Sequence, residues 1–213
     1  MDDQTSMPAV NTQAMKQALR QRIIAARREL VESERLRLNE AIVGGLLRLE
    51  SYRSASTVLA YMNFGTEFAA EKLARQALQD GKQLLLPKVN PATKELDIYR
   101  VTDLQQDLAP GPWQIREPLA QRCILVSVLH EVDFMLLPGV AFGRDGARLG
   151  YGGGYYDKLL ARMSAQDSSH RPALVAGAYA MQIITGIPQD SNDRKVEWLV
   201  SENETLACAV ADI

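Results

Sequence analysis

Residues 143–158 read GRDGARLGYGGGYYDK, and no other stretch of the chain says as much about its fold. They follow an apolar run, Val132 to Leu137, which is typical of a buried strand, and they contain the predicted start of a helix at Tyr155. Gly152 to Gly154 have no Cβ, so the backbone there can adopt positive φ and turn successive N–H groups toward an anion. The stretch therefore predicts a phosphate-binding loop between a strand and a helix of an α/β protein.

A flexible glycine turn is the plainer interpretation of the same residues. However, three ordered glycines in a row carry a high cost in backbone entropy, which indicates a steric demand for close approach. Arg144, Arg148 and Lys158 add positive charge beside the loop, and the N-terminal dipole of the predicted helix points at the same place. These features favour anion binding over a simple turn.

The loop matches neither of the standard nucleotide-binding motifs. A Walker A loop requires Gly-Lys followed by Ser or Thr, whereas the Gly81–Lys82 pair is followed by Gln83. A dinucleotide fingerprint beginning at Gly150 would require its third glycine at the position of Tyr155. The sequence excludes both motifs.

Apolar periodicity alternates between helices and strands along the chain, which predicts a layered α/β fold. The expected class is a three-layer sandwich with a mostly parallel central sheet and a helical N-terminal segment. We expect a disordered tail at residues 1–13 and a single domain at residues 14–213. The expected helices cover residues 14–31, a segment opened by Ser33, 69–79 and 155–163, and the expected strands cover residues 56–61, 83–86, 96–101, 124–128, 132–137, 174–178 and 196–200.

The composition limits the class of protein. A chain of 213 residues, of which 46% are hydrophobic and 23% charged, can bury the core of one enzyme domain. Its net charge of -2 provides no field for nucleic acid or anionic lipid. No apolar stretch approaches the roughly 18 residues that cross a bilayer, and the acidic, polar start lacks the features of a signal peptide. We therefore expect a cytoplasmic protein without a nucleic-acid or membrane partner.

Two groups of residues receive purely structural interpretations. Cys123 and Cys208 lie far apart in apolar surroundings, which suits buried thiols in a reducing compartment. A local basic patch, which composition alone predicts to be a solvated helix face, consists of Arg20, Arg22, Arg27 and Arg28.

Residues 136–160, LLPGVAFGRDGARLGYGGGYYDKLL, closely resemble the signature of the 5-formyltetrahydrofolate cyclo-ligases, also called methenyltetrahydrofolate synthetases. The resemblance continues with varying strength from about Lys16 to Val200. It implies an enzyme that closes 5-formyltetrahydrofolate to 5,10-methenyltetrahydrofolate while ATP is hydrolysed to ADP and phosphate. The implied cofactors are ATP and Mg²⁺, the implied partner is a small folate with or without additional glutamates, and we expect a monomer.

In this family an early basic pair and the glycine loop bind ATP. Lys16 and Arg20 stand four residues apart, so they share one helix face and can converge on one phosphate chain, although spacing alone favours a solvated pair. The resemblance also implies catalytic roles for Arg148 and Asp157. The implied nucleotide-binding residues are Lys16, Arg20, Arg148, Leu149, Gly150, Tyr151, Gly152, Gly153, Gly154, Tyr155 and Tyr156.

Residues 62–67, MNFGTE, are similar to the family stretch whose glutamate contacts the folate. Without the resemblance, Glu67 is a carboxylate that favours the start of a helix. Trp113 resembles the aromatic residue that could stack on the pterin, and its alternative is a core tryptophan. The implied folate-binding residues are Met62, Glu67, Trp113, Tyr151 and Tyr155.

Asp157 and Asp193 are the magnesium ligands that the resemblance implies. Mg²⁺ keeps several waters, so one or two carboxylates suffice when phosphate oxygens complete its coordination. Taken alone, the two residues read as a carboxylate in the first turn of a helix and as a turn residue.

The chain departs from the family at several positions. Some members carry Arg and Lys where Tyr151 and Gly153 stand, and many have a glutamate and a histidine where Ser191 and Asn192 stand. Positive charge near the loop must then come from Arg144, Arg148, Lys16 or Arg20.

Two alternatives to a cyclo-ligase stay open at this point. One is an ATP-binding regulatory protein of the same fold without the reaction. The other is a different phosphoryl- or acyl-transfer enzyme on a related scaffold, since fold alone never defines the substrate. Retention of Glu67 and Trp113 argues against the second. The cyclo-ligase chemistry asks for no protein nucleophile, which agrees with the lack of a GxSxG motif.

Overall fold

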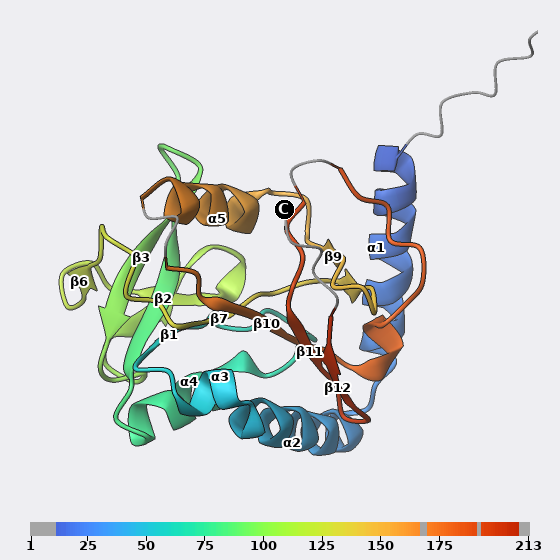
Figure 1. Ribbon diagram of the computed structural model, residues 1–213, viewed down its shortest axis with the longest axis horizontal. Helices are drawn as coiled ribbons and strands as arrows, with labels where there is room; N and C mark the ends of the chain where they lie inside the picture. The colour runs from blue at the N-terminus through green and yellow to red at the C-terminus, as the bar shows by residue number, and fades with distance from the viewer. Residues whose placement is uncertain (1–11, 167–169, 191–192, 209–213) are drawn as a thin grey trace, which may run out of the picture.

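The structure is a computed structural model that describes residues 12–166, 170–190 and 193–208 (Figure 1). Its helices are α1 (Thr12–Arg28), α2 (Glu32–Arg48), α3 (Glu50–Arg53), α4 (Ala70–Gln79) and α5 (Tyr155–Gln166), with short 3-10 helices η1 (Pro112–Gln114) and η2 (Ala180–Gln182). Its strands are β1 (Thr57–Leu59), β2 (Gln83–Asn90), β3 (Glu95–Val101), β4 (Leu108–Pro110), β5 (Arg116–Pro118), β6 (Ile124–Leu125), β7 (Phe134–Leu136), β8 (Ala141–Phe142), β9 (Arg148–Leu149), β10 (Ala173–Gly177), β11 (Trp198–Val200) and β12 (Thr205–Ala207).

Eight of these strands form the central sheet, in the order β12-β11-β10-β7-β1-β2-β3-β6. The neighbours from β11 to β2 pair in parallel, while β12, β3 and β6 pair antiparallel at the edges. Two small hairpins, β4–β5 and β8–β9, stand apart from it. The predicted α/β class with a mostly parallel sheet and N-terminal helices is confirmed.

The sheet separates two apolar cores. Helices α2, α3 and α4 cover one face, and α5 covers the other (Figure 1). On the first face, α2 buries Leu38, Ile42 and Leu46, which form one stripe because they are four residues apart. On the second face, α5 buries Leu159 and Met163 by the same spacing. Each such side chain stabilises the fold by about 1.5–3 kcal/mol, so these stripes position the layers.

The order of the parallel strands marks a ligand-binding crevice. From β1 the chain passes to β2 on one side, and it later returns to β7 on the other side of β1. The connection that leaves β1 and the connection that leaves β7 therefore run to opposite sides of the sheet, which leaves a crevice between the carboxyl ends of these two strands. Ligands of open α/β sheets bind at such a point.

Helix α1 stands at one end of the molecule, beside the β8–β9 hairpin (Figure 1). Its Ile23 is buried in a cluster with Ala141 of β8 and Leu149 of β9. This apolar contact holds one face of α1 against the chain segment that leads into the glycines.

Several elements differ from the expectations. The strand expected at residues 124–128 is the two-residue edge strand β6, whose Ile124 is 64% exposed, because an apolar run does not distinguish core from surface. The strand expected at 83–86 continues to Asn90. The sheet does not end at residues 196–200, because β12 adds a further edge strand. Helix α1 begins at Thr12, and residues 1–11 of the expected tail lie outside the described part. Across the described segments, no helix combines the length and apolar character that crossing a bilayer requires.

Gly44 and Gly45 of α2 test the packing between this helix and the sheet. A Cβ on Gly45 would lie 2.5 Å from Cγ1 of the buried Val200, whereas one on Gly44 would meet Nη1 of the flexible Arg48 at 3.4 Å. We expect Gly45→Ala to lower the free energy of unfolding by about 1–3 kcal/mol through overpacking. Gly44→Ala should raise it by up to about 1 kcal/mol, because alanine favours a helix. Urea unfolding measures both, and effects of equal sign would contradict this packing.

Candidate active site

A cavity of about 1000 Å³ opens at the crevice between the carboxyl ends of β1 and β7. Tyr61 and Met62, which follow β1, and Pro138, which follows β7, form part of its lining. Helix α1, the glycine loop (residues 150–154) and the segment around Asp190 contribute further polar residues to the lining. Every residue predicted to bind nucleotide, folate or metal lines this cavity except Trp113, whose side chain lies outside the described part. The fold thus brings together predicted site residues from both ends of the chain.

Three positions of the glycine loop favour glycine. Two have a positive φ, and at the third a side chain would collide with a neighbouring ring. Gly152 has a φ of +101° and Gly154 a φ of +67°, conformations that L side chains rarely adopt. The φ of Gly153 is not positive, so the expectation of that conformation is wrong at this residue. A Cβ on Gly153 would instead lie 2.7 Å from the ring of Tyr155. The exposed N–H groups of Gly152 and Gly153 donate to no acceptor within the described residues, which leaves them available to an anion.

Arg20 of α1 lies across the start of the glycine loop. Its Nε donates a hydrogen bond of 2.8 Å to the carbonyl oxygen of Gly150. The guanidinium is also 3.5 Å from the place where a Cβ on Gly152 would stand. The loop therefore approaches a positive charge closely, as phosphate binding requires.

Lys16, one turn earlier on α1, is almost fully buried between two carboxylates. Its Nζ donates to Oδ2 of Asp190 at 2.7 Å and to Oδ2 of Asp193 at 2.6 Å. Burial by itself would lower the pKa of Lys16, but the hydrogen bonds and charges of the two aspartates outweigh it and raise that pKa. Lys16 therefore stays charged and ties the segment at Asp190 to α1.

Arg148 and Asp157, the two predicted catalytic residues, form a direct ion pair. Nη2 of Arg148 donates to Oδ1 of Asp157 at 2.5 Å, and Nη1 donates to the carbonyl oxygen of Pro138 at 3.2 Å. The Arg148 side chain is 5% exposed, and its Nε has no partner among the described residues. Asp157 lies in the first turn of α5, where a carboxylate interacts favourably with the helix dipole.

Glu67 is a buried carboxylate next to the tyrosines of the loop. Its Oε2 accepts the backbone N–H of Phe64 at 2.7 Å. Burial raises the pKa of Glu67, while the neighbouring Tyr151, the hydrogen bond from Phe64 and the charge of Arg27 act in the opposite direction. Met62 lies beside it at the cavity wall. The arrangement places a buried hydrogen-bond acceptor at a partly aromatic wall of the cavity.

Comparison with known proteins places the chain in a family. The sequence profile of the 5-formyltetrahydrofolate cyclo-ligase family matches residues 12–202. The chain belongs to the 5-formyltetrahydrofolate cyclo-ligase family. It is 28% identical to the 5-formyltetrahydrofolate cyclo-ligase of Mus musculus over 92% of this chain and 98% of that protein. It is 29% identical to the cyclo-ligase of Haemophilus influenzae over 86% and 95% of the two chains.

A solved structure of this cyclo-ligase family agrees with the fold. The chain is 33% identical to 5,10-methenyltetrahydrofolate synthetase of Aquifex aeolicus, with a TM-score of 0.76 over 93% of this chain and 95% of that one. The 5,10-methenyltetrahydrofolate synthetase of Mycoplasma pneumoniae, at 21% identity and a TM-score of 0.67, supports the fold alone. The family prediction from the glycine signature is confirmed.

The basic residues that lie near the glycine loop are only partly those that the sequence predicted. Arg144 does not line the cavity and pairs instead with Glu204. Lys158 is exposed and donates to the carbonyl oxygen of Lys94. Arg27, expected on a solvated face, is instead buried behind Tyr151. Helical spacing from Lys16 and Arg20 could have indicated Arg27, because positions 16, 20, 23 and 27 share one face.

The cyclo-ligase cavity offers Mg²⁺ two carboxylates rather than a cage. No group of three or more metal-ligating His, Cys, Asp or Glu side chains occurs within the described residues. Asp157 and Asp193 both line the cavity, each paired with one basic residue. Because Mg²⁺ that is bound by phosphates needs only one or two carboxylates, these residues fit the ion. Asp190, which the sequence analysis missed, adds a third oxygen donor group beside Asp193.

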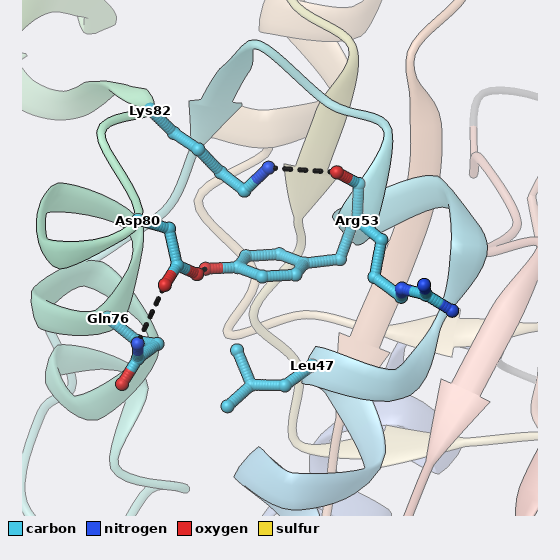
Figure 2. Close-up of a pocket in the computed structure, with 6 residues that line it drawn as sticks. Leu47, Arg53, Gln76, Asp80 and Lys82 are labelled. Atoms are coloured by element: carbon cyan, nitrogen blue, oxygen red, sulfur yellow. Dashed lines mark hydrogen bonds between the residues drawn. The ribbon is translucent and has the colours of Figure 1, made fainter.

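A second pocket of about 460 Å³ lies among α2, α3 and α4, next to Asp80 and Lys82 (Figure 2). Its polar groups satisfy one another: Asp80 accepts from Gln76 and from Tyr52, and Lys82 donates to the carbonyl oxygens of Arg53 and Ala55. Because its donors and acceptors are already paired with one another, this pocket has a structural role and offers few polar groups to a substrate.

The Arg148–Asp157 pair predicts a measurable stability effect. Asp157→Asn leaves the buried guanidinium of Arg148 without its counter-ion, so we expect a loss of about 2 kcal/mol in the free energy of unfolding. Arg144→Gln, which breaks an exposed pair with Glu204, should cost less than about 1 kcal/mol. Denaturant unfolding of the two variants gives the comparison. Equal losses would show that Arg148 does not depend on Asp157.

Proposed function

We propose that this chain closes 5-formyltetrahydrofolate to 5,10-methenyltetrahydrofolate in a reaction that consumes ATP and releases ADP and phosphate. The single observation that carries the proposal is the family match over residues 12–202. The convergence of the predicted residues on one cavity supports it. Magnesium as the metal, a monomeric state and a cytoplasmic location belong to the proposal as well.

The residues around the glycine loop would hold the phosphates. The free N–H groups of Gly152 and Gly153 supply donors, and Arg20 supplies a charge next to them. Lys16 stands at the same wall with an ammonium group that its aspartates keep charged. Such donors act by aligning the phosphoryl group and neutralising its charge.

The other side of the cavity would hold the folate. Glu67 can accept N–H groups of the pterin, Met62 and Tyr155 can cover its faces, and Trp113 remains a proposed stacking residue. The phosphoryl group from ATP makes the formyl oxygen a leaving group, so that the neighbouring amine of the folate attacks the formyl carbon, the C–O bond breaks and phosphate departs. No side chain of the protein has to act as a nucleophile.

Asp157 and Asp193 would hold Mg²⁺, whose role is to neutralise charge on the transferring phosphoryl group. Both carboxylates already lie at the cavity, opposite basic partners. With the ion bound, Asp157 and Asp193 would share their negative charge with it, and the charges of Arg148 and Lys16 would be available to phosphate oxygens.

A direct assay tests the proposal. Purified protein mixed with Mg-ATP and 5-formyltetrahydrofolate should develop the ultraviolet absorbance of the methenyl product, and omission of ATP should abolish it. Binding of ATP without product formation would contradict the proposed reaction and favour a regulatory protein of the same fold. Size-exclusion chromatography of the same preparation tests the monomer.

Gly153→Val tests the loop. A side chain there would push the ring of Tyr155 by its contact at 2.7 Å, so we expect at least about tenfold weaker ATP binding, equivalent to about 1.4 kcal/mol, with an unchanged fold. Calorimetric titration with ATP and circular dichroism measure the two properties, and Gly44→Ala serves as a control away from the cavity. Unchanged affinity would remove Gly153 from the nucleotide site.

Asp157→Asn tests the metal. The variant should turn over more slowly and require a higher Mg²⁺ concentration for half of its maximal rate, because a neutral amide is a weaker magnesium ligand. A magnesium titration at saturating ATP gives the value, and the melting temperature separates this effect from lost stability. A normal magnesium requirement would exclude Asp157 as a ligand.

A further inference from the structure

We propose that Glu117 is a specificity-determining residue of the folate site, whose carboxylate accepts the 2-amino and N3–H groups at the pyrimidine edge of the pterin. The inference rests on the proposed function, in which the cavity binds a folate. It adds a second carboxylate to the folate site beside Glu67, from a residue to which the sequence analysis assigned no role.

Glu117 belongs to the wall of the cavity that lies opposite α1. It is the middle residue of β5, and it lines the cavity together with Val89 of β2 and Leu96 of β3. In Figure 1, β2 and β3 stand on the left of the molecule and α1 stands on the right. The residues proposed to hold phosphate, Lys16 and Arg20, come from α1. A folate that occupies the cavity opposite the phosphates therefore meets Glu117.

The carboxylate of Glu117 is buried, yet one of its oxygens lacks a hydrogen bond. The residue is 6% exposed, and its Oε1 accepts the backbone N–H of Val89 at 3.3 Å. Its Oε2 is 3.8 Å from Nζ of Lys88, too far for a hydrogen bond, and that ammonium donates at 2.9 Å to the carbonyl oxygen of Pro118. Within the described residues, no N–H or O–H group donates to Oε2. Lys88 thus balances the charge of Glu117 but leaves acceptor positions open at the cavity, where a ligand can supply the donors.

The backbone beside Glu117 is shaped to make room for this carboxylate. A Cβ on Gly111 would lie 2.6 Å from Oε2 and 2.7 Å from Cδ of Glu117. In the turn that follows, Gln114 has a φ of +63°, which residues other than glycine rarely adopt. Strained residues of this kind cluster at ligand sites, where the surrounding structure holds them in place. The same turn carries Trp113, the proposed stacking residue for the pterin.

The donors of a reduced pterin match two separate carboxylates. The 2-amino group and N3–H stand side by side at the pyrimidine edge, while N8–H belongs to the other ring. Two adjacent donors fit the two oxygens of one carboxylate, which is the arrangement that makes bidentate pairs strong and specific. Glu117 presents its open carboxylate between the apolar side chains of Val89 and Leu96, which suit the faces of a flat ring. Oε2 of Glu67 already holds the short hydrogen bond from Phe64, so Glu67 is left to accept the single N8–H.

A comparison of two ligands tests the contact in the full-length protein. One ligand is 5-formyltetrahydrofolate, and the other is its 2-desamino-2-methyl analogue, in which a methyl group replaces the 2-amino group. Calorimetric titration without ATP gives both affinities. We expect the unchanged protein to bind the analogue at least about tenfold more weakly, because the analogue leaves a buried charged acceptor without its donor.

The variants locate this discrimination at Glu117. Glu117→Ala should bind 5-formyltetrahydrofolate at least about tenfold more weakly and should lose most of the difference between the two ligands. Glu117→Gln keeps one acceptor oxygen and should retain part of the difference. Glu95→Gln is the matched control, because the Glu95 carboxylate is 47% exposed and pairs with Arg162. It should discriminate like the unchanged protein.

Lys88→Met separates ligand recognition from a purely structural role of Glu117. We expect this variant to keep the difference between the two ligands, since the carboxylate remains. Melting temperatures show which variants are folded, and Glu117→Gln carries the test if Glu117→Ala does not fold. A ratio of affinities that is the same in the Glu117 variants as in the unchanged protein would overturn the contact with the 2-amino group.

The outcomes also separate this inference from the proposed function, because the titration requires no turnover. Discrimination that depends on Glu117 in a protein that forms no methenyl product would overturn the cyclo-ligase reaction and support the contact. Formation of the product with discrimination that does not depend on Glu117 would overturn the contact alone. A protein that binds no folate would overturn both.

Discussion

The apolar contact between α1 and the β8–β9 hairpin is the interaction on which the rest of the site depends. Ile23 packs with Ala141 and Leu149, and this places one face of α1 along the loop that follows β9. Lys16, Arg20 and Arg27 stand on that face and reach the segment at Asp193, the carbonyl of Gly150 and the hydroxyl of Tyr151. The hydrophobic contact thus positions the basic residues of α1 beside the glycine loop, which contains no charged residue.

The site concentrates charge in places where charge is costly. Within the described residues, Lys16, Arg27, Glu67 and Arg148 are all buried and all belong to the site or its support. Lys16 and Arg148 have carboxylate partners, which reduce the cost of their burial without removing it. Substrates that carry several negative charges can replace those partners. In the free protein, the buried basic residues therefore lower the free energy of unfolding, while their charge remains available to an anionic substrate.

The glycine loop shows why residue type and backbone geometry must be considered separately. Three consecutive glycines suggested one common reason, close approach of the backbone to an anion. The structure has two reasons, positive φ at Gly152 and Gly154 and the ring of Tyr155 next to Gly153. A sequence alone does not distinguish them, because both exclude a side chain. Likewise, the apolar residues at 124–128 lie partly at an exposed sheet edge, which only the order of strands reveals.

The amino-acid sequence by itself determined the α/β class, the central role of residues 143–158 and the family, because alternating periodicity and a long glycine signature are local properties of the chain. It also indicated Lys16, Glu67, Asp157 and Asp193 through the family motif. Only the tertiary structure decided the partners of these residues: Lys16 meets Asp190 and Asp193 across 174 and 177 residues of sequence. The burial of Arg27 was decided in the same way. From sequence, a charged side chain is predicted to be exposed to solvent. Its burial depends on packing between segments that are distant in the chain, and the neighbouring residues do not indicate that packing.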